Sequence, residues 1–244
     1  MKKLIEIIDL DKSFGGVHAI NHLSFDVYEG EILGLIGPNG SGKSTCVNLI
    51  TGVYTQDSGD IIYQNSYLKK QSIPERAFMG LGRTFQSPKP FTNLTVRESV
   101  YTIAMLHNRS LKTANERTDE IIEMAGFTGI AGTLCAKLPI EKRKWLDMAR
   151  VLAINPTLLM LDECLAGLTP SEMGESVALV KKINQTGVTV LFIEHVMSAV
   201  TRLCHRVVVL NEGKLLSEGD PAIVMREEAV IKAYLGEDYK NVKD

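Results

Sequence analysis

The stretch Gly37-Pro38-Asn39-Gly40-Ser41-Gly42-Lys43-Ser44-Thr45 decides the fold of this 244-residue chain. It matches the pattern G-x-x-x-x-G-K-[ST], in which a glycine-rich loop surrounds a phosphate chain. The apolar run 32–36 precedes the motif and the mostly apolar segment 46–50 follows it, which is the strand–loop–helix order that the motif requires. The alternative is a glycine-rich turn that matches by chance, but four fixed positions in this context argue against it. The stretch therefore predicts a binding site for a nucleoside triphosphate.

The residue types in this loop suit phosphate binding for physical reasons. Glycine lets the backbone turn tightly, so that successive N–H groups point inward at a polyphosphate. The helix that begins at the loop adds the positive end of its dipole. We expect Lys43 to reach the β- and γ-phosphates and the Ser44 hydroxyl to ligate Mg²⁺.

A second strand that ends in acidic side chains supplies the other half of such a site. Leu158–Leu161 is an apolar run, and Asp162 and Glu163 follow it directly. We expect Asp162 to hold the Mg²⁺ shell and Glu163 to polarise the attacking water as a general base. Two neighbouring carboxylates could instead cap the following turn, but the glycine-rich loop earlier in the chain favours the site.

Three further residues have two interpretations each. Gln86 follows the strand-like run Leu81–Phe85, where an amide could reach the metal or the water, although a lone Gln is more often a surface residue. His195 follows the buried run Leu191–Ile193, where open α/β sheets place ligands, and a neutral imidazole there could bond a γ-phosphate. A lone His is also often structural. Phe14 is either a core aromatic or a stacking face for adenine, and the residues alone favour the core.

The composition is that of an ordinary soluble globular protein, with 45% hydrophobic and 23% charged residues. A net charge of -2 and the lack of a long basic run give no reason to expect a nucleic acid partner. The amino-terminal segment is too short and too acidic for a secretory signal. No apolar run approaches the roughly 18–20 residues that cross a bilayer, so any membrane role would require a partner. The four cysteines show no pairing or metal pattern and are expected to be small buried fillers.

The patterns along the chain predict an α/β core with an inserted helical lobe. Thr95-Val96-Arg97-Glu98 and Thr113-Ala114-Asn115-Glu116 read as capping boxes that open two helices, the second ending near Gly126. A third helix is expected over Glu141–Ala153, where Trp145, Ala149 and Leu152 form an apolar stripe. We therefore predict an ATP-binding α/β core over residues 1–86 and 154–244 and a helical subdomain over 87–153.

Turn residues and apolar runs place the strands of the core. Turns are expected at Gly15-Gly16, at Glu29-Gly30 and at Asp57-Ser58-Gly59-Asp60, and a hairpin is expected around Asn211-Glu212-Gly213-Lys214. The predicted strands are Leu4–Asp9, Leu23–Val27, Leu158–Leu161, Val188–Ile193 and Arg206–Leu210.

Taken in order, these motifs resemble the nucleotide-binding subunit of ABC transporters, over essentially the whole chain. Gly37–Thr45 matches the Walker A loop, Gln86 the Q-loop glutamine, Asp162-Glu163 the Walker B pair and His195 the switch histidine. The resemblance implies an ATPase with ATP and Mg²⁺ as cofactors, with Glu163, His195 and Gln86 as catalytic residues. It also implies that Ser44, Gln86 and Asp162 hold the metal and that Phe14 stacks on adenine, against the interpretation from the residues alone. The fold that it implies is a P-loop core with an antiparallel β part near the amino terminus.

Finer motifs are similar to the branched-chain amino acid importer branch of that family. They are Phe14-Gly15-Gly16-Val17, Arg83-Thr84-Phe85-Gln86, Ala166-Gly167-Leu168, Ile193-Glu194-His195 and Ala233-Tyr234-Leu235-Gly236-Glu237. This resemblance implies integral-membrane permease subunits and a second ABC ATPase subunit as partners, and a periplasmic or extracellular binding protein as an indirect one. It also implies a peripheral location at the cytoplasmic face of the cell membrane.

The chain departs from the family in the signature motif, Leu-Ser-Gly-Gly-Gln. The aligned residues are Leu138, Pro139, Ile140, Glu141 and Lys142, of which only the leucine matches. The serine hydroxyl and the bare glycine backbone that would contact a γ-phosphate are missing, and Glu141 would repel a phosphate unless Lys142 offsets its charge. As a helix start the segment is good, since it has an early proline and an acid in the first turn. Two smaller departures are Cys164, in place of a proline, and Thr169, in place of Asp or Asn.

Three hypotheses follow. The first is the ATPase subunit of an importer that works as a heterodimer with a second cassette, although a homodimer is an alternative. The second is an ATP-binding regulatory or structural module with little hydrolysis, which the altered signature favours. The third is the ATPase of an exporter with another cargo, such as lipid.

Overall fold

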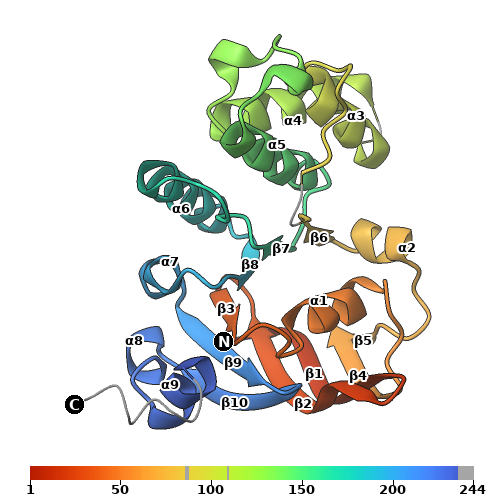
Figure 1. The fold of residues 1–244 in the computed structure, drawn as a ribbon. Coiled ribbons are helices and arrows are strands. Elements are labelled where there is room, and N and C mark those ends of the chain that lie inside the picture. The colour runs from red at the N-terminus through yellow and green to blue at the C-terminus, as the bar shows by residue number, and fades with distance from the viewer. Residues whose placement is uncertain (86–87, 109, 236–244) are drawn as a thin grey trace. The chain divides into compact units, whose positions relative to one another are not determined.

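The computed structural model describes residues 1–85, 88–108 and 110–235 (Figure 1). The chain forms two compact units. The first unit contains residues 1–73 and 191–244, and the second contains residues 74–190. These compact units differ in their boundaries from the ATP-binding core (1–86 and 154–244) and helical subdomain (87–153) expected from the sequence, and that functional division stays a prediction. Gln86 lies outside the described residues.

The first unit contains an antiparallel sheet with the strand order β2-β1-β4-β5. Its strands are β1 (Lys3–Phe14), β2 (Val17–Tyr28), β4 (Ser58–Tyr63) and β5 (Ser66–Tyr67). The turn at Gly15-Gly16 joins β1 to β2 as predicted, and both strands are longer than expected. The turn predicted at residues 57–60 is wrong beyond Asp57, because Ser58 already pairs with Asp11 of β1. Ladder hydrogen bonds there outweigh the local preference of these residues for a turn.

The first unit also carries the strands that position the glycine-rich loop. β3 (Ile32–Ile36) is buried at all five residues and runs parallel to β9 (Arg206–Asn211). β9 and β10 (Lys214–Gly219) form the predicted hairpin, with Lys214 opposite Asn211. A fully buried apolar strand is typical of a parallel sheet that is covered on both faces. The remaining helices of this unit are α1 (Lys43–Thr51), α7 (Met197–Leu203), α8 (Pro221–Val224) and α9 (Glu228–Leu235).

The second unit contains a helical lobe and a short parallel strand pair. α3 (Val96–His107), α4 (Leu111–Met124) and α5 (Ile140–Leu152) gather in the lobe (Figure 1). β6 (Leu81–Arg83) runs parallel to β7 (Leu158–Asp162). The unit also contains α6 (Pro170–Gln185) and the 3-10 turns η1 (Thr128–Ile130) and η2 (Cys135–Lys137). Two elements cross the boundary between the units along the chain: α2 (Ile73–Phe78) and β8 (Thr189–Ile193).

The helix starts test the capping predictions directly. At α3 the box is confirmed: the Thr95 side chain accepts from the Glu98 backbone N–H, and the Glu98 carboxylate accepts from the Thr95 backbone N–H. The predicted start of α4 is wrong, because the Ser110 hydroxyl caps the helix by accepting from the backbone N–H of Thr113. Thr113 therefore lies in the first turn. α5 matches its prediction to within one residue at each end.

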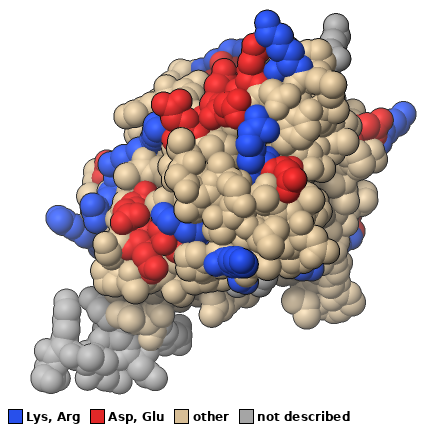
Figure 2. Space-filling model, turned by 90° about the horizontal axis from the view of Figure 1, so that it is seen from above, with Lys and Arg blue, Asp and Glu red and all other residues tan. Residues whose placement is uncertain are grey.

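The cysteines lie in the interior, and charged residues of both signs lie on the surface. All four cysteines are buried with free thiols, as predicted. Burial raises the pKa of Cys46 and of Cys204 to about 12, so both thiols stay protonated. Figure 2 shows Lys and Arg interspersed with Asp and Glu over one face of the molecule. Within the described ranges, no helix has the length and apolar character needed to span a membrane.

Candidate nucleotide-binding site

The glycine-rich loop leaves β3 and enters α1 within the first unit, and two of its glycines are sterically required. Gly37 has φ +147° and Gly42 has φ +105°, both unfavourable for other residues. A Cβ atom at Gly37 would lie 2.2 Å from the carbonyl oxygen of Leu210, and one at Gly42 would lie 2.6 Å from that of Ala19. The loop backbone therefore packs directly against β9 and β2.

Backbone hydrogen bonds fix the end of the loop and the start of α1. The Gly213 N–H in the β9–β10 turn donates to the Ser41 carbonyl oxygen over 3.0 Å, and the Cys46 N–H donates to that of Gly42 over 2.8 Å. Gly42 is the N-cap of α1 and has no side chain with which to cap it. The first-turn N–H groups of α1 are therefore not capped by the N-cap side chain, which is the geometry of an anion-binding helix N-terminus.

Lys43 places its positive charge inside the loop. Its ammonium donates to the carbonyl oxygens of Gly37 at 2.8 Å and of Pro38 at 2.9 Å, and the residue is 8% exposed. Ser44, the next residue, is exposed on the first turn of α1. The predicted phosphate-binding lysine and metal-binding hydroxyl thus lie side by side at the start of the helix.

Phe14 is a surface aromatic residue, so the interpretation as a core residue is wrong. It ends β1, is 42% exposed, and contacts the ring of Tyr54 edge-on with centroids 5.0 Å apart. The ammonium of Lys12 lies over the ring, 5.4 Å from its centroid. Tyr54 was not predicted, although an aromatic residue shortly after α1 is visible in the sequence. The pair offers an exposed aromatic surface in the unit that holds the glycine-rich loop.

His195 is exposed in the segment between β8 and α7. It follows Glu194, which is fully buried. The placement just beyond the carboxyl end of a core strand is the predicted one, and it suits a side chain that contacts a ligand.

In the second unit, Asp162 lies at the carboxyl end of β7 and is held by an arginine. Its Oδ2 atom lies 2.8 Å from Nη2 of Arg83, and both side chains are largely buried. The Asp162 backbone N–H also donates to the Thr84 hydroxyl over 3.4 Å. The role of Arg83 was not predicted. A usable signal was present, since Arg83 ends one strand and Asp162 ends another.

Glu163 sits on a sharp backbone turn immediately after β7. Its φ of +48° is in the left-handed region, which costs a non-glycine residue roughly 1–2 kcal/mol. The ammonium of Lys144, on α5, donates to the carbonyl oxygen of Ala166 and, over 3.5 Å, to that of Glu163. The turn that carries the predicted base is therefore tied to α5. The next helix, α6, begins just beyond this loop. Thr169 is its N-cap and forms a capping box with Glu172.

The segment aligned with the signature motif forms the start of α5, and its N-cap side chain makes no capping hydrogen bond. Pro139 precedes α5, whose first residue, Ile140, is 49% exposed. Glu141 is 8% exposed, and its Oε1 atom lies 3.2 Å from Nζ of Lys142. Leu138 is buried. The role of the segment as a helix start is confirmed. Lys142 pairs with Glu141, while its effect on a bound phosphate stays a prediction.

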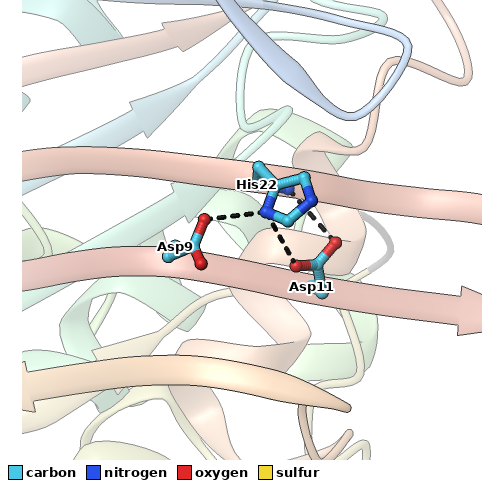
Figure 3. Close-up of side chains that lie close together, drawn as sticks. All are labelled: Asp9, Asp11 and His22. Carbon is cyan, nitrogen blue, oxygen red and sulfur yellow. Dashed lines mark hydrogen bonds and ion pairs between the residues drawn. The ribbon is translucent and has the colours of Figure 1, made fainter.

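A separate polar cluster lies on the β1–β2 hairpin (Figure 3). Nδ1 of His22 is 2.8 Å from Oδ1 of Asp9 and 3.4 Å from Oδ2 of Asp11. The hydrogen bond to Asp9 and the charge of Asp11 raise the pKa of His22. The cluster was not predicted, and its hydrogen bonds join the two strands where their register shifts.

Comparison with known proteins identifies two family models in the chain. The model described as "ABC transporter" matches residues 20–166, and the model described as "Branched-chain amino acid ATP-binding cassette transporter" matches residues 214–240. The first match spans the glycine-rich loop, the altered signature segment and the Asp162-Glu163 pair.

Relatives match the chain over nearly its full length. The high-affinity branched-chain amino acid transport ATP-binding protein LivG of Escherichia coli K12 is 33% identical over 96% of this chain and 98% of its own. The lipopolysaccharide export system ATP-binding protein LptB of the same strain is 28% identical over 95% and 97%. The ADP conformation of MJ1267, an ATP-binding cassette of an ABC transporter, superposes with a TM-score of 0.87 at 26% identity, covering 97% of this chain and 100% of that one. With a matching nucleotide-binding segment, a matching fold and full-length relatives, the chain belongs to the ABC transporter ATP-binding family, whose members are ATPases that power transport.

Proposed function

We propose that this chain is the ATP-binding and hydrolysing subunit of an ABC importer for branched-chain or other hydrophobic amino acids. The observation that carries the cargo class is the match of residues 214–240 to the branched-chain family, together with the full-length similarity to LivG. The geometry of the glycine-rich loop supports the nucleotide part of the proposal, since two glycines at positive φ, a buried lysine and the uncapped N-terminus of α1 are features that suit phosphate binding.

Each predicted residue receives a role in this proposal. Residues 37–45 surround the phosphates, and Phe14 stacks on adenine. Ser44, Gln86 and Asp162 offer the hydroxyl, amide and carboxylate oxygens that Mg²⁺ prefers, and the bound ion would neutralise charge on the β- and γ-phosphates.

The remaining two residues act on the reaction itself. Glu163 accepts a proton from the attacking water as the water adds to the γ-phosphorus and the bond to the bridging oxygen breaks. His195 donates a hydrogen bond to the γ-phosphate. A Glu163→Gln substitution retains the shape of this side chain and removes its basicity, so it tests the role directly.

The altered signature suggests an asymmetric pair of cassettes. Pro139 lacks an N–H group, Ile140 places a branched side chain where glycine is expected, and Glu141 adds a carboxylate that Lys142 neutralises. A site between this chain's residues 37–45 and a partner's intact signature would hydrolyse ATP, whereas the reciprocal site would be weak. We therefore propose a heterodimer with a second cassette. A homodimer would carry the altered signature at both sites and would turn over slowly.

The proposal includes a peripheral location at the cytoplasmic face of the cell membrane, on two permease subunits. A periplasmic or extracellular binding protein would deliver the cargo, and nucleic acid has no role. The similarity to LptB supports one alternative, an exporter of a lipid cargo. The altered signature supports another, a regulatory module with little hydrolysis.

Reconstitution separates these alternatives. The chain is combined in liposomes with its co-encoded permease and second cassette, and ATP hydrolysis is measured with and without a binding protein loaded with leucine. Stimulation by the loaded binding protein supports the importer. Stimulation by lipid substrate alone supports the exporter, and an inert complex in which only the second cassette hydrolyses ATP supports the regulatory module.

A further inference from the structure

The pair of Arg83 and Asp162 is a largely buried ion pair at the adjacent ends of β6 and β7. Nη2 of Arg83 lies 2.8 Å from Oδ2 of Asp162, and the two side chains are only 11% and 8% exposed. A carboxylate this far from water requires a countercharge or several hydrogen bonds. The guanidinium of Arg83 supplies that countercharge.

The backbone fixes where the guanidinium comes from. β6 runs parallel to β7 with Arg83 opposite Met160, and the Thr84 N–H donates to the Met160 carbonyl oxygen over 2.9 Å. The Asp162 backbone N–H in turn donates a hydrogen bond to the Thr84 hydroxyl oxygen. Asp162 therefore lies two residues past the partner of Arg83, and two backbone-anchored bonds hold the strand ends together.

We propose that Arg83 is the positioning residue for the metal-binding carboxylate: it holds Oδ2 of Asp162 and leaves the other carboxylate oxygen for the Mg²⁺ shell. This inference rests on the proposed role of Asp162 in Mg²⁺ binding. Groups that orient a metal-binding side chain in this way typically contribute 10- to 100-fold to metal affinity.

Two physical effects of Arg83 on Mg²⁺ have opposite signs, and the structure decides between them. A cation close to the metal repels it, and removing that cation would tighten Mg²⁺ binding. However, the guanidinium is paired directly with Asp162, so the two charges largely cancel at a distance. Without Arg83, a nearly buried carboxylate would lose its countercharge and its fixed orientation. The positioning effect therefore dominates, and the loss of Arg83 weakens Mg²⁺ binding.

The test measures the Mg²⁺ enhancement of nucleotide binding, defined as the ratio of the dissociation constants of a fluorescent, non-hydrolysable ATP analogue in EDTA and in saturating Mg²⁺. The variants are Arg83→Gln and Arg83→Lys. The control is Arg97→Gln, which removes another arginine–aspartate pair, that with Asp119, from the same unit. We expect Arg83→Gln to lower the enhancement about tenfold, with the dissociation constant in EDTA unchanged. Arg83→Lys should give an intermediate value and Arg97→Gln the parental one.

An equal or larger enhancement in Arg83→Gln than in the parent chain would overturn the inference, and a larger one would show that repulsion dominates. A parent chain whose nucleotide binding does not respond to Mg²⁺ would contradict the proposed role of Asp162 itself. Should Arg83→Gln fail to fold, Arg83→Lys decides: a reduced enhancement with unchanged binding in EDTA supports the inference, and a parental enhancement overturns it.

Discussion

The ammonium of Lys142 lies 3.6 Å from the centroid of the Trp145 ring while it also pairs with Glu141. The same ammonium therefore forms an ion pair with a carboxylate and a cation–π contact with an aromatic ring, both within the first two turns of α5. The charged side chains of the segment aligned with the signature motif therefore have partners on α5 itself. The side chains of Glu141 and Lys142 are thus paired with each other, and the carboxylate is not available to a further cation without breaking that pair.

Restoring the family's chemistry in this segment should raise the activity of the isolated chain. The combined variant Pro139→Ser, Ile140→Gly and Glu141→Gly supplies a hydroxyl and bare backbone and removes the carboxylate. We expect at least a tenfold increase in steady-state ATPase rate, with a stability loss of about 1–2 kcal/mol from glycine in the first turn. An unchanged rate in a folded variant would show that the altered signature does not limit turnover.

The Glu163→Gln substitution should separate binding from hydrolysis. The amide keeps the size of the side chain but cannot accept the proton of the attacking water, so turnover in the presence of the partner cassette should fall by about 10²–10⁴-fold. ATP binding, measured with a fluorescent analogue, should be retained. Glu175→Gln, at an exposed position on α6, is the matched control and should behave as the parent. Comparable turnover in both variants would contradict the role of Glu163 as the general base.

Two glycines of the nucleotide loop provide a matched test of its packing. Gly37→Ala should destabilise the chain by about 2–4 kcal/mol, since its Cβ would overlap the Leu210 carbonyl oxygen at 2.2 Å. Gly40→Ala meets no atom within 4 Å and should lose only about 1 kcal/mol, from its φ of +79°. Urea unfolding of the two variants measures the difference. Equal losses would mean that the loop does not pack against β9 as described.

The His22 cluster predicts a pH-dependent contribution to stability. Because Asp9 and Asp11 raise the pKa of His22, the folded state favours the imidazolium. This contribution is fully present below the unfolded pKa of about 6.5 and is lost as the pH rises through the higher folded pKa. An NMR titration should place the pKa of His22 above 6.5, and Asp9→Asn should lower it toward that value. A His22 that titrates at 6.5 in the parent chain would contradict the cluster.

The sequence was informative where one local pattern determines the geometry. The glycine-rich loop, the Thr95 capping box and the Asn211–Lys214 hairpin are all of this kind, because each depends on neighbours in sequence. It failed where two local solutions compete: Ser110 and Thr113 are both good helix caps, and in the structure Ser110 is the N-cap of α4.

Contacts between distant segments were the other source of error. Residues 58–60 join a strand because β1 is beside them. The Arg83–Asp162 pair depends on the parallel pairing of β6 and β7, which brings together residues far apart in the chain. Phe14 looked like a core residue because hydrophobicity does not report that a strand ends at the surface.

The bond from Lys144 to the carbonyl oxygen of Ala166 gives α5 a mechanical role. The same helix begins at Ile140, beside the segment that would face a partner's nucleotide, and is tethered one turn later to the loop that follows Glu163. Lys144 therefore links the first two turns of α5 to that loop. We therefore expect a change at the start of α5 to alter the position of the loop that follows Glu163.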